Sequence, residues 1–168
     1  MTYSEIHTAI VEITREKCNE CQTRLNSIPK ENVTERKAVS LEYGIYTFCG
    51  NAGLLFNTTG DGSNVVIQRG KSHFKYAIGK YPMLNEVYFA LNEEEKLRFI
   101  AAIQGELLIR DTWLSSQYAE LSAAEASGDT TKAFEFKIKI GAALHMFAAW
   151  ENWRQENNIY PNLFEEGK

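Results

Sequence analysis

The sequence predicts a mainly α-helical, compact domain with a small β or irregular insertion near residues 62–91. Apolar residues recur every three or four positions over four long stretches, as one buried face of a helix requires. These stretches lie near 3–28, 34–56, 92–125 and 130–157. Between the second and third stretches, turn formers and a short alternating segment replace that rhythm. An α+β fold is the alternative.

The first two stretches are predicted as helices. In the stretch 3–28 the glutamates fall off the apolar stripe, and Pro29, which cannot continue a helix, follows its end. The stretch 34–56 keeps the same rhythm, although each of its three glycines weakens a helix by about 1 kcal/mol. Because Leu41, Tyr43 and Ile45 also alternate, a pair of strands is the alternative there.

The insertion begins with a turn. Residues 57–64, which read NTTGDGSN, are dense in turn formers and predict a loop. Residues 73–79 then place Phe74, Tyr76 and Ile78 on one side, as a strand with a polar outer face does. We therefore expect a short hairpin or an irregular β segment that ends at Pro82.

Asn92, followed by three glutamates, marks the start of the third helix, because an Asn side chain caps free N–H groups and acidic residues suit the helix dipole. Gly128 and Asp129 break this helix, and Thr130 or Thr131 is the expected cap of the next, which predicts an antiparallel helical hairpin. The apolar stripe of the third helix comprises Ile100, Ile103, Leu107, Leu114, Tyr118 and Leu121.

The segment 133–157 fits two patterns. Phe134 and Ile138, with Phe136 and Ile140, alternate with charged residues as in a strand. A helical stripe instead runs through Phe136, Ile140, Ala143, Phe147 and Trp150, and it continues past the usual length of a strand. The helix is the favoured interpretation.

The chain is predicted to be a single domain, 1–168, in the cytoplasm. Its 168 residues match the common size of one domain. The N-terminus lacks the apolar core of a signal peptide, and no run of about 18 apolar residues suggests membrane contact. Three cysteines, an odd number, fit a reducing compartment.

No motif for a metal, a cofactor or a catalytic residue is present, and none is assigned. Cys18-x-x-Cys21 supplies two thiols, whereas zinc needs four ligands, and Cys49 and the histidines are scattered singly. Cys21 lies on an apolar stripe with Cys18 beside it, which predicts buried or half-buried free thiols.

The question of enzymatic activity stays open, with a non-enzymatic role favoured. His145 lies in an apolar helical context that favours a core or boundary position over a general base. Glu106 and Asp111, next to Arg110, are acids inside an otherwise apolar segment. They could form an acid–base group, but a mid-helix ion pair or an exposed face is favoured.

A basic stretch is the candidate contact surface. Residues 1–84 carry a net charge of +2 and residues 85–168 a net charge of −6, and between Asp61 and Glu86 there is no acidic residue. Such asymmetry suggests a surface that meets a partner. A solvated edge strand, kept from aggregating by its lysines, is the favoured interpretation of this stretch, and binding of an acidic protein surface comes next. The sequence pI of about 5.5 disfavours nucleic acid. The candidate partner-binding residues are Arg69, Lys71, His73, Lys75, Tyr76 and Lys80, with Trp153 and Tyr160 as aromatic anchors.

The sequence thus favours a small cytosolic protein-interaction module, a regulator, inhibitor or immunity-type partner. One alternative is a small hydrolase or transferase whose histidine and carboxylate meet only in the fold. The other is an acidic mimic of nucleic acid that blocks a nucleic-acid-binding protein. A homo-oligomer is compatible with all three. The mimic would present Glu93, Glu94, Glu95, Glu106, Glu120 and Glu125.

Overall fold

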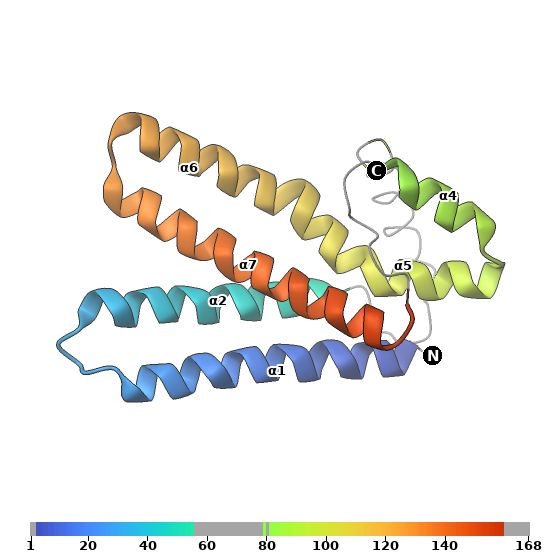
Figure 1. Cartoon of the computed structure of the whole chain (residues 1–168), viewed down its shortest axis with the longest axis horizontal. Helices are drawn as coiled ribbons and strands as arrows, with labels where there is room; N and C mark the ends of the chain where they lie inside the picture. The colour runs from blue at the N-terminus through green and yellow to red at the C-terminus, as the bar shows by residue number, and fades with distance from the viewer. Residues whose placement is uncertain (1–2, 56–78, 80, 160–168) are drawn as a thin grey trace.

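A computed structural model describes residues 3–55, 79 and 81–159 of the chain, and within these ranges the regular secondary structure is entirely helical (Figure 1). The prediction of a mainly α fold is therefore confirmed. The elements are α1 (Tyr3–Ser27), α2 (Val33–Leu55), α4 (Pro82–Ala90), α5 (Glu93–Leu108), the π-helical segment η1 (Ile109–Leu114), α6 (Ser115–Ser127) and α7 (Thr130–Glu156).

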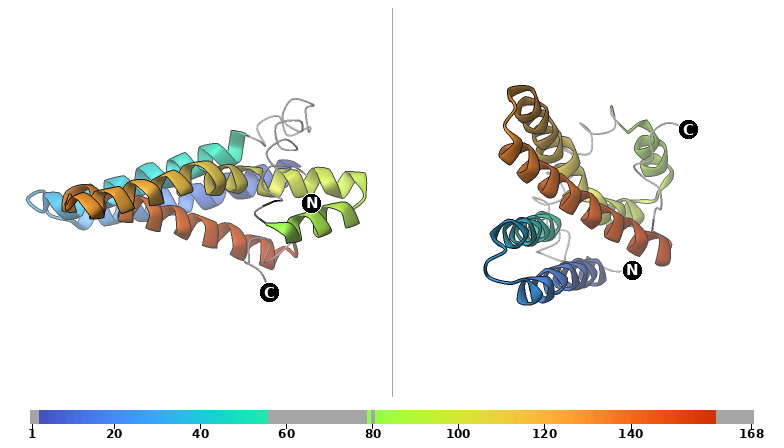
Figure 2. Two further views of the ribbon diagram at one scale, coloured as in Figure 1. Left: turned by 90° about the horizontal axis from the view of Figure 1, so that it is seen from above. Right: turned by 60° about the vertical axis from the view of Figure 1, so that its left-hand side comes forward.

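Two long helical hairpins build the fold. Helices α1 and α2 form one antiparallel pair, and α6 and α7 form the other, with α7 lying between α6 and α2 (Figure 1). Figure 2 shows the two pairs as separate layers at the end of the molecule where their connections lie, which we call the distal end. At the opposite end, α5 also packs against α2, so the core there is enclosed on more sides.

The helix ends follow from local hydrogen bonds. The Asn92 side chain accepts a bond of 2.9 Å from the N–H of Glu95, as its sequence predicts. Gly128 ends α6 with a positive φ of 72°, which glycine adopts without strain. Asp129, not Thr130 or Thr131 as expected, caps α7 by accepting a bond from the N–H of Lys132.

The burial along α7 decides between its two predicted patterns. Ile140, Ala143, Phe147 and Trp150 are buried on one stripe, whereas Phe134, which a strand would have buried with them, is exposed. The stripe belongs to the larger core cluster, which it shares with α1, α2 and η1. A second cluster, of Tyr81, Leu84, Phe99, Ile103 and Leu107, joins α4 to α5.

Two predictions are wrong in detail. Residues 82–90, expected to be β or irregular, are the helix α4, because Pro82 stands in its first turn, where the missing N–H is no loss. Tyr118, expected on the buried stripe, is 46% exposed. The wider turn of η1 shifts the helical phase before α6, so the stripe no longer reaches Tyr118. The rest of the predicted insertion, 62–78, lies outside the described residues.

Candidate functional site

A buried ion cluster of Glu106, Arg110 and Arg154 links α5, η1 and α7. Glu106 is 2% exposed and Arg154 is 1% exposed. Nε and Nη2 of Arg110 donate to Oε1 of Glu106 at 3.1 and 2.9 Å, and Nη1 of Arg154 donates to Oε2. Both carboxylate oxygens are thus engaged, which a buried charge requires if its desolvation is to be offset.

Aromatic and thiol groups surround this buried ion cluster. The guanidinium of Arg110 lies over the ring of Phe147, 4.4 Å from its centroid. Burial, with a smaller contribution from the charge of Glu106, raises the pKa of the Cys49 thiol to about 12. A thiol that holds its proton so firmly is a poor nucleophile. The arrangement therefore ties helices together rather than activating a reactive group.

The sequence anticipated half of this cluster. The predicted mid-helix ion pair of Glu106 and Arg110 is present, at a spacing of four residues. No pattern in the sequence pairs Glu106 with Arg154, which stands among polar residues near the end of α7. The one sequence feature that points to burial of Arg154 is its position four residues after Trp150, which lies on the buried stripe.

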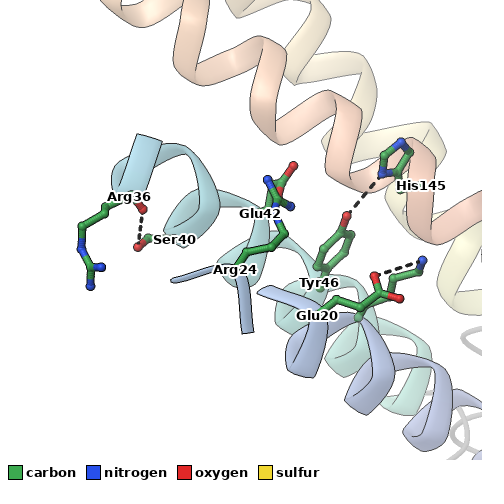
Figure 3. A network of polar contacts seen from close by, with 8 residues as sticks. Glu20, Arg24, Arg36, Ser40, Glu42, Tyr46 and His145 are labelled. Carbon is green, nitrogen blue, oxygen red and sulfur yellow. Dashed lines mark hydrogen bonds and ion pairs between the residues drawn. The ribbon is translucent and has the colours of Figure 1, made fainter. Parts of the chain in front are cut away.

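A second polar group lies where α1, α2 and α7 meet (Figure 3). The buried Tyr46 hydroxyl is 3.4 Å from Nδ1 of His145, and Arg24 forms an ion pair with Glu42 beside it. Burial, followed by the charge of Glu42, raises the pKa of Tyr46 to about 12. His145 itself is exposed. Within the described ranges its hydrogen-bond partner is a phenol, so this group lacks the carboxylate that orients a general base.

Cys18 and Cys21 are placed as expected. Cys21 and Cys49 are buried free thiols, and Cys18 is half-buried with its sulfur 3.7 Å from Oγ1 of Thr47. Burial, followed by the charge of Glu42, raises the pKa of Cys21 to about 11. In the part of the chain that the structure describes, no three His, Cys, Asp or Glu side chains gather as metal ligands would.

The predicted partner-binding residues are only partly placed. Trp153 is half-buried on α7. Among the acids of the proposed nucleic-acid mimic, Glu106 is enclosed and cannot present its charge, which corrects that expectation, and Glu125 pairs with Lys137 at 3.4 Å. The others, Arg69, Lys71, His73, Lys75, Tyr76, Lys80 and Tyr160, lie outside the described residues.

Apolar side chains that reach solvent form a further candidate surface, which the sequence did not reveal. Phe48 on α2 is 39% exposed, and its ring lies 5.2 Å from that of Trp113 on η1. Trp113 is half-buried against the core cluster that contains Ala143. This pair brings together residues 65 positions apart, so helical periodicity within one segment could not predict it.

Comparison with protein-family models, curated proteins and solved structures found no match. None of the helices in the described ranges combines the length and the apolar character needed to cross a membrane.

Proposed function

We propose that this chain is a protein-interaction module that acts as a regulator, inhibitor or immunity-type partner by binding another protein. The observation that carries the proposal is the partly exposed ring of Phe48 on α2, which lies against Trp113 of η1. Aromatic side chains presented in this way are the usual anchors of protein interfaces, because they bury a large area with little loss of conformational freedom.

The buried ion cluster and the group around His145 fit the same function, because their side chains are engaged with partners within the chain. The carboxylate of Glu106 is held by two guanidinium groups, and the imidazole of His145 meets the hydroxyl of Tyr46. These contacts within the chain stabilise its fold and give no support to the hydrolase or transferase alternative. The basic stretch predicted from sequence, Arg69 to Lys80, would add attraction for an acidic partner in the cytoplasm.

The test begins with affinity capture from the source cells and identification of the retained protein by mass spectrometry. The purified pair should form a complex of fixed stoichiometry in light scattering. Phe48→Ala should weaken the complex at least about tenfold, as loss of an interface anchor does. Phe89→Ala is the matched control, because Phe89 is also exposed but lies on α4.

Two results would overturn the proposal. One is turnover of ester, amide or acyl-transfer substrates by the purified chain alone, with no protein retained in stoichiometric amount. The other is a complex whose affinity is unchanged by both Phe48→Ala and Phe89→Ala, since the exposed ring of Phe48 would then have no part in binding.

A further inference from the structure

We propose that the solvent-facing side of α7 forms an antiparallel homodimer, so that a second copy of this chain covers it. This side, the α7 outer face, is a row of residues that follow one another in alternating steps of four and three. The row consists of Phe134, Ile138, Gly141, His145, Ala148 and Asn152. The inference goes beyond the proposed function, because it requires no other protein.

The α7 outer face is largely apolar, yet it is open to solvent. Phe134 in the row and Leu144 beside it are 40% and 41% exposed. A Cβ added at Gly141 would meet no atom within 4 Å, so another backbone can approach closely there. Helices α2 and α6 pack on other sides of α7, which lies along one outer side of the molecule (Figures 1 and 2). An exposed apolar face of this kind marks a protein contact.

The α7 outer face has the spacing of a coiled-coil seam. Steps of four and three make the seven-residue repeat with which two helices pack side by side. In an antiparallel pair centred near residue 143, every layer sets a larger side chain against a smaller one, as close packing across facing positions requires. These layers are Phe134 with Asn152, Ile138 with Ala148 and His145 with Gly141.

The charges beside the α7 outer face select a second copy and its direction. Lys137, Leu144 and Glu151 follow one another at intervals of seven residues along one flank of the row. In the antiparallel pair, Lys137 faces Glu151 of the second copy, and Leu144 faces its own counterpart at the two-fold axis. A parallel pair would instead set Glu151 against Glu156 of the second copy, two like charges.

The two charges of this flank are accessible. Lys137 pairs with Glu125 of α6 at 3.4 Å, but the two side chains are 62% and 52% exposed. Such a surface pair contributes at most about 1 kcal/mol and leaves the ammonium group open to a second carboxylate. Glu151 is half-buried, and none of the ion pairs among the described residues includes it.

The dimer should be reversible and weak. Packing within the chain already holds α7 helical, so association does not have to form the helix, as it must for a short isolated peptide. From Phe134 to Asn152 the contact is about 27 Å long and one helix wide. Such a contact lies at the low end of the sizes of specific interfaces, and we expect a dissociation constant in the micromolar range.

Sedimentation equilibrium of the full chain, from low micromolar to submillimolar concentration, tests the dimer. Leu144→Glu should abolish it, because two carboxylates would meet at the two-fold axis. Lys137→Glu should weaken it at least about tenfold, and Lys137→Glu with Glu151→Lys should restore it. The control is Lys132→Glu, a reversal at a 70% exposed side chain of α7 outside the row, which should leave the dimer unchanged. Circular dichroism shows whether each variant keeps its helical content.

Cross-linking tests the direction of the pair. Leu144→Cys should give a covalent dimer with a short bis-maleimide reagent, because the two introduced thiols lie beside each other at the two-fold axis. Phe134→Cys is the matched control, since its counterpart lies about 27 Å away in the antiparallel pair and next to it in a parallel one. The parent chain, with its own cysteines, provides the background.

Four results would each overturn the inference. They are a chain that stays monomeric over the whole concentration range, a dimer that Leu144→Glu leaves intact, a charge exchange that fails to restore the affinity lost in Lys137→Glu, and cross-linking of Phe134→Cys in place of Leu144→Cys. A complex with another protein that depends on Phe48 is compatible with any of them, so the proposed function is tested separately.

Discussion

Glu106 and Arg154 stand 48 residues apart in the chain and meet in an ion pair that is buried on both sides. The pair fixes α7 against α5 at the point where the π-helical turn begins, and Arg110 completes the coordination of the carboxylate from η1.

Removing one member of this pair should be strongly destabilising. Arg154→Met leaves the buried Glu106 without one of its two guanidinium partners, and we expect a loss of about 3–5 kcal/mol in the free energy of unfolding. The double variant Glu106→Gln with Arg154→Met should recover part of that loss, because the uncompensated charge is gone. Urea denaturation measures both.

The exposed pair of Glu94 and Arg98 is the control, and Arg98→Met should change stability little, since surface ion pairs contribute at most about 1 kcal/mol. If Arg154→Met lowered the free energy of unfolding no more than Arg98→Met, the buried ion cluster would not hold α7 in place.

Two glycines of α2 should respond in opposite directions to alanine. At Gly50 an added Cβ would lie 2.5 Å from Cγ2 of Thr14 on α1, so Gly50→Ala should destabilise by about 1–3 kcal/mol. At Gly44 nothing lies within 4 Å, and Gly44→Ala should stabilise the helix by about 0.5–1 kcal/mol.

Thermal or urea unfolding of both variants gives the comparison. Adding Thr14→Ala to Gly50→Ala should restore part of the lost stability, because the overlapping Oγ1 and Cγ2 atoms are removed. A Gly50→Ala variant as stable as the parent would show that α1 and α2 are not in close contact at this point.

The buried thiols should make the fold sensitive to alkali. The pKa of Cys21 is raised from 9.0 to about 11 and that of Cys49 from 9.0 to about 12, so the folded state holds these protons more tightly than the unfolded state. Their contribution to the free energy of unfolding is therefore complete below about pH 9 and declines as the pH rises through the folded-state values. Urea denaturation at about pH 8 and about pH 10.5 measures the decline.

The double variant Cys21→Ala with Cys49→Ala separates the thiols from other alkaline groups. Its free energy of unfolding should decline less between the two pH values than that of the parent. An identical decline in both proteins would mean that the two thiols ionise as easily in the fold as in the unfolded chain.

Charge reversal in the basic stretch should act on association kinetics. Lys71→Glu with Lys75→Glu should slow binding to an acidic partner and weaken its salt dependence, while the melting temperature stays nearly constant. Reversal of Lys30, an exposed residue between α1 and α2, serves as the control. Stopped-flow association rates at low and high salt would contradict the prediction if both variants matched the parent.

Features confined to one helix could be predicted from the sequence, whereas features that join distant helices could not. The stripe through Ile140, Ala143, Phe147 and Trp150 and the cap at Asn92 depend on residues a few positions apart. The burial of Arg154 depends on a carboxylate in another helix, so no local pattern predicts it.

The exposure of Tyr118 has a different cause. Its predicted burial assumed an unbroken period of 3.6 residues from α5 through α6, and a π-helical turn carries more residues per turn than that period allows. The segment Ile109 to Leu114 contains no glycine or proline that would indicate a departure from the α-helical period. The exposed Phe48 ring was missed for the reason that applies to Arg154, since its neighbour Trp113 belongs to another element.

The short connections of the two hairpins also bear on how the chain folds. Contacts within each hairpin join residues near in sequence, whereas the contacts of α2 with α7 join residues almost a hundred positions apart, such as Lys37 with Glu135 and Tyr46 with His145. Local helical pairs form early, and closing a loop of that length carries the larger entropic barrier. We therefore expect docking of one hairpin on the other to limit the folding rate, with side chains between α2 and α7 forming the nucleus.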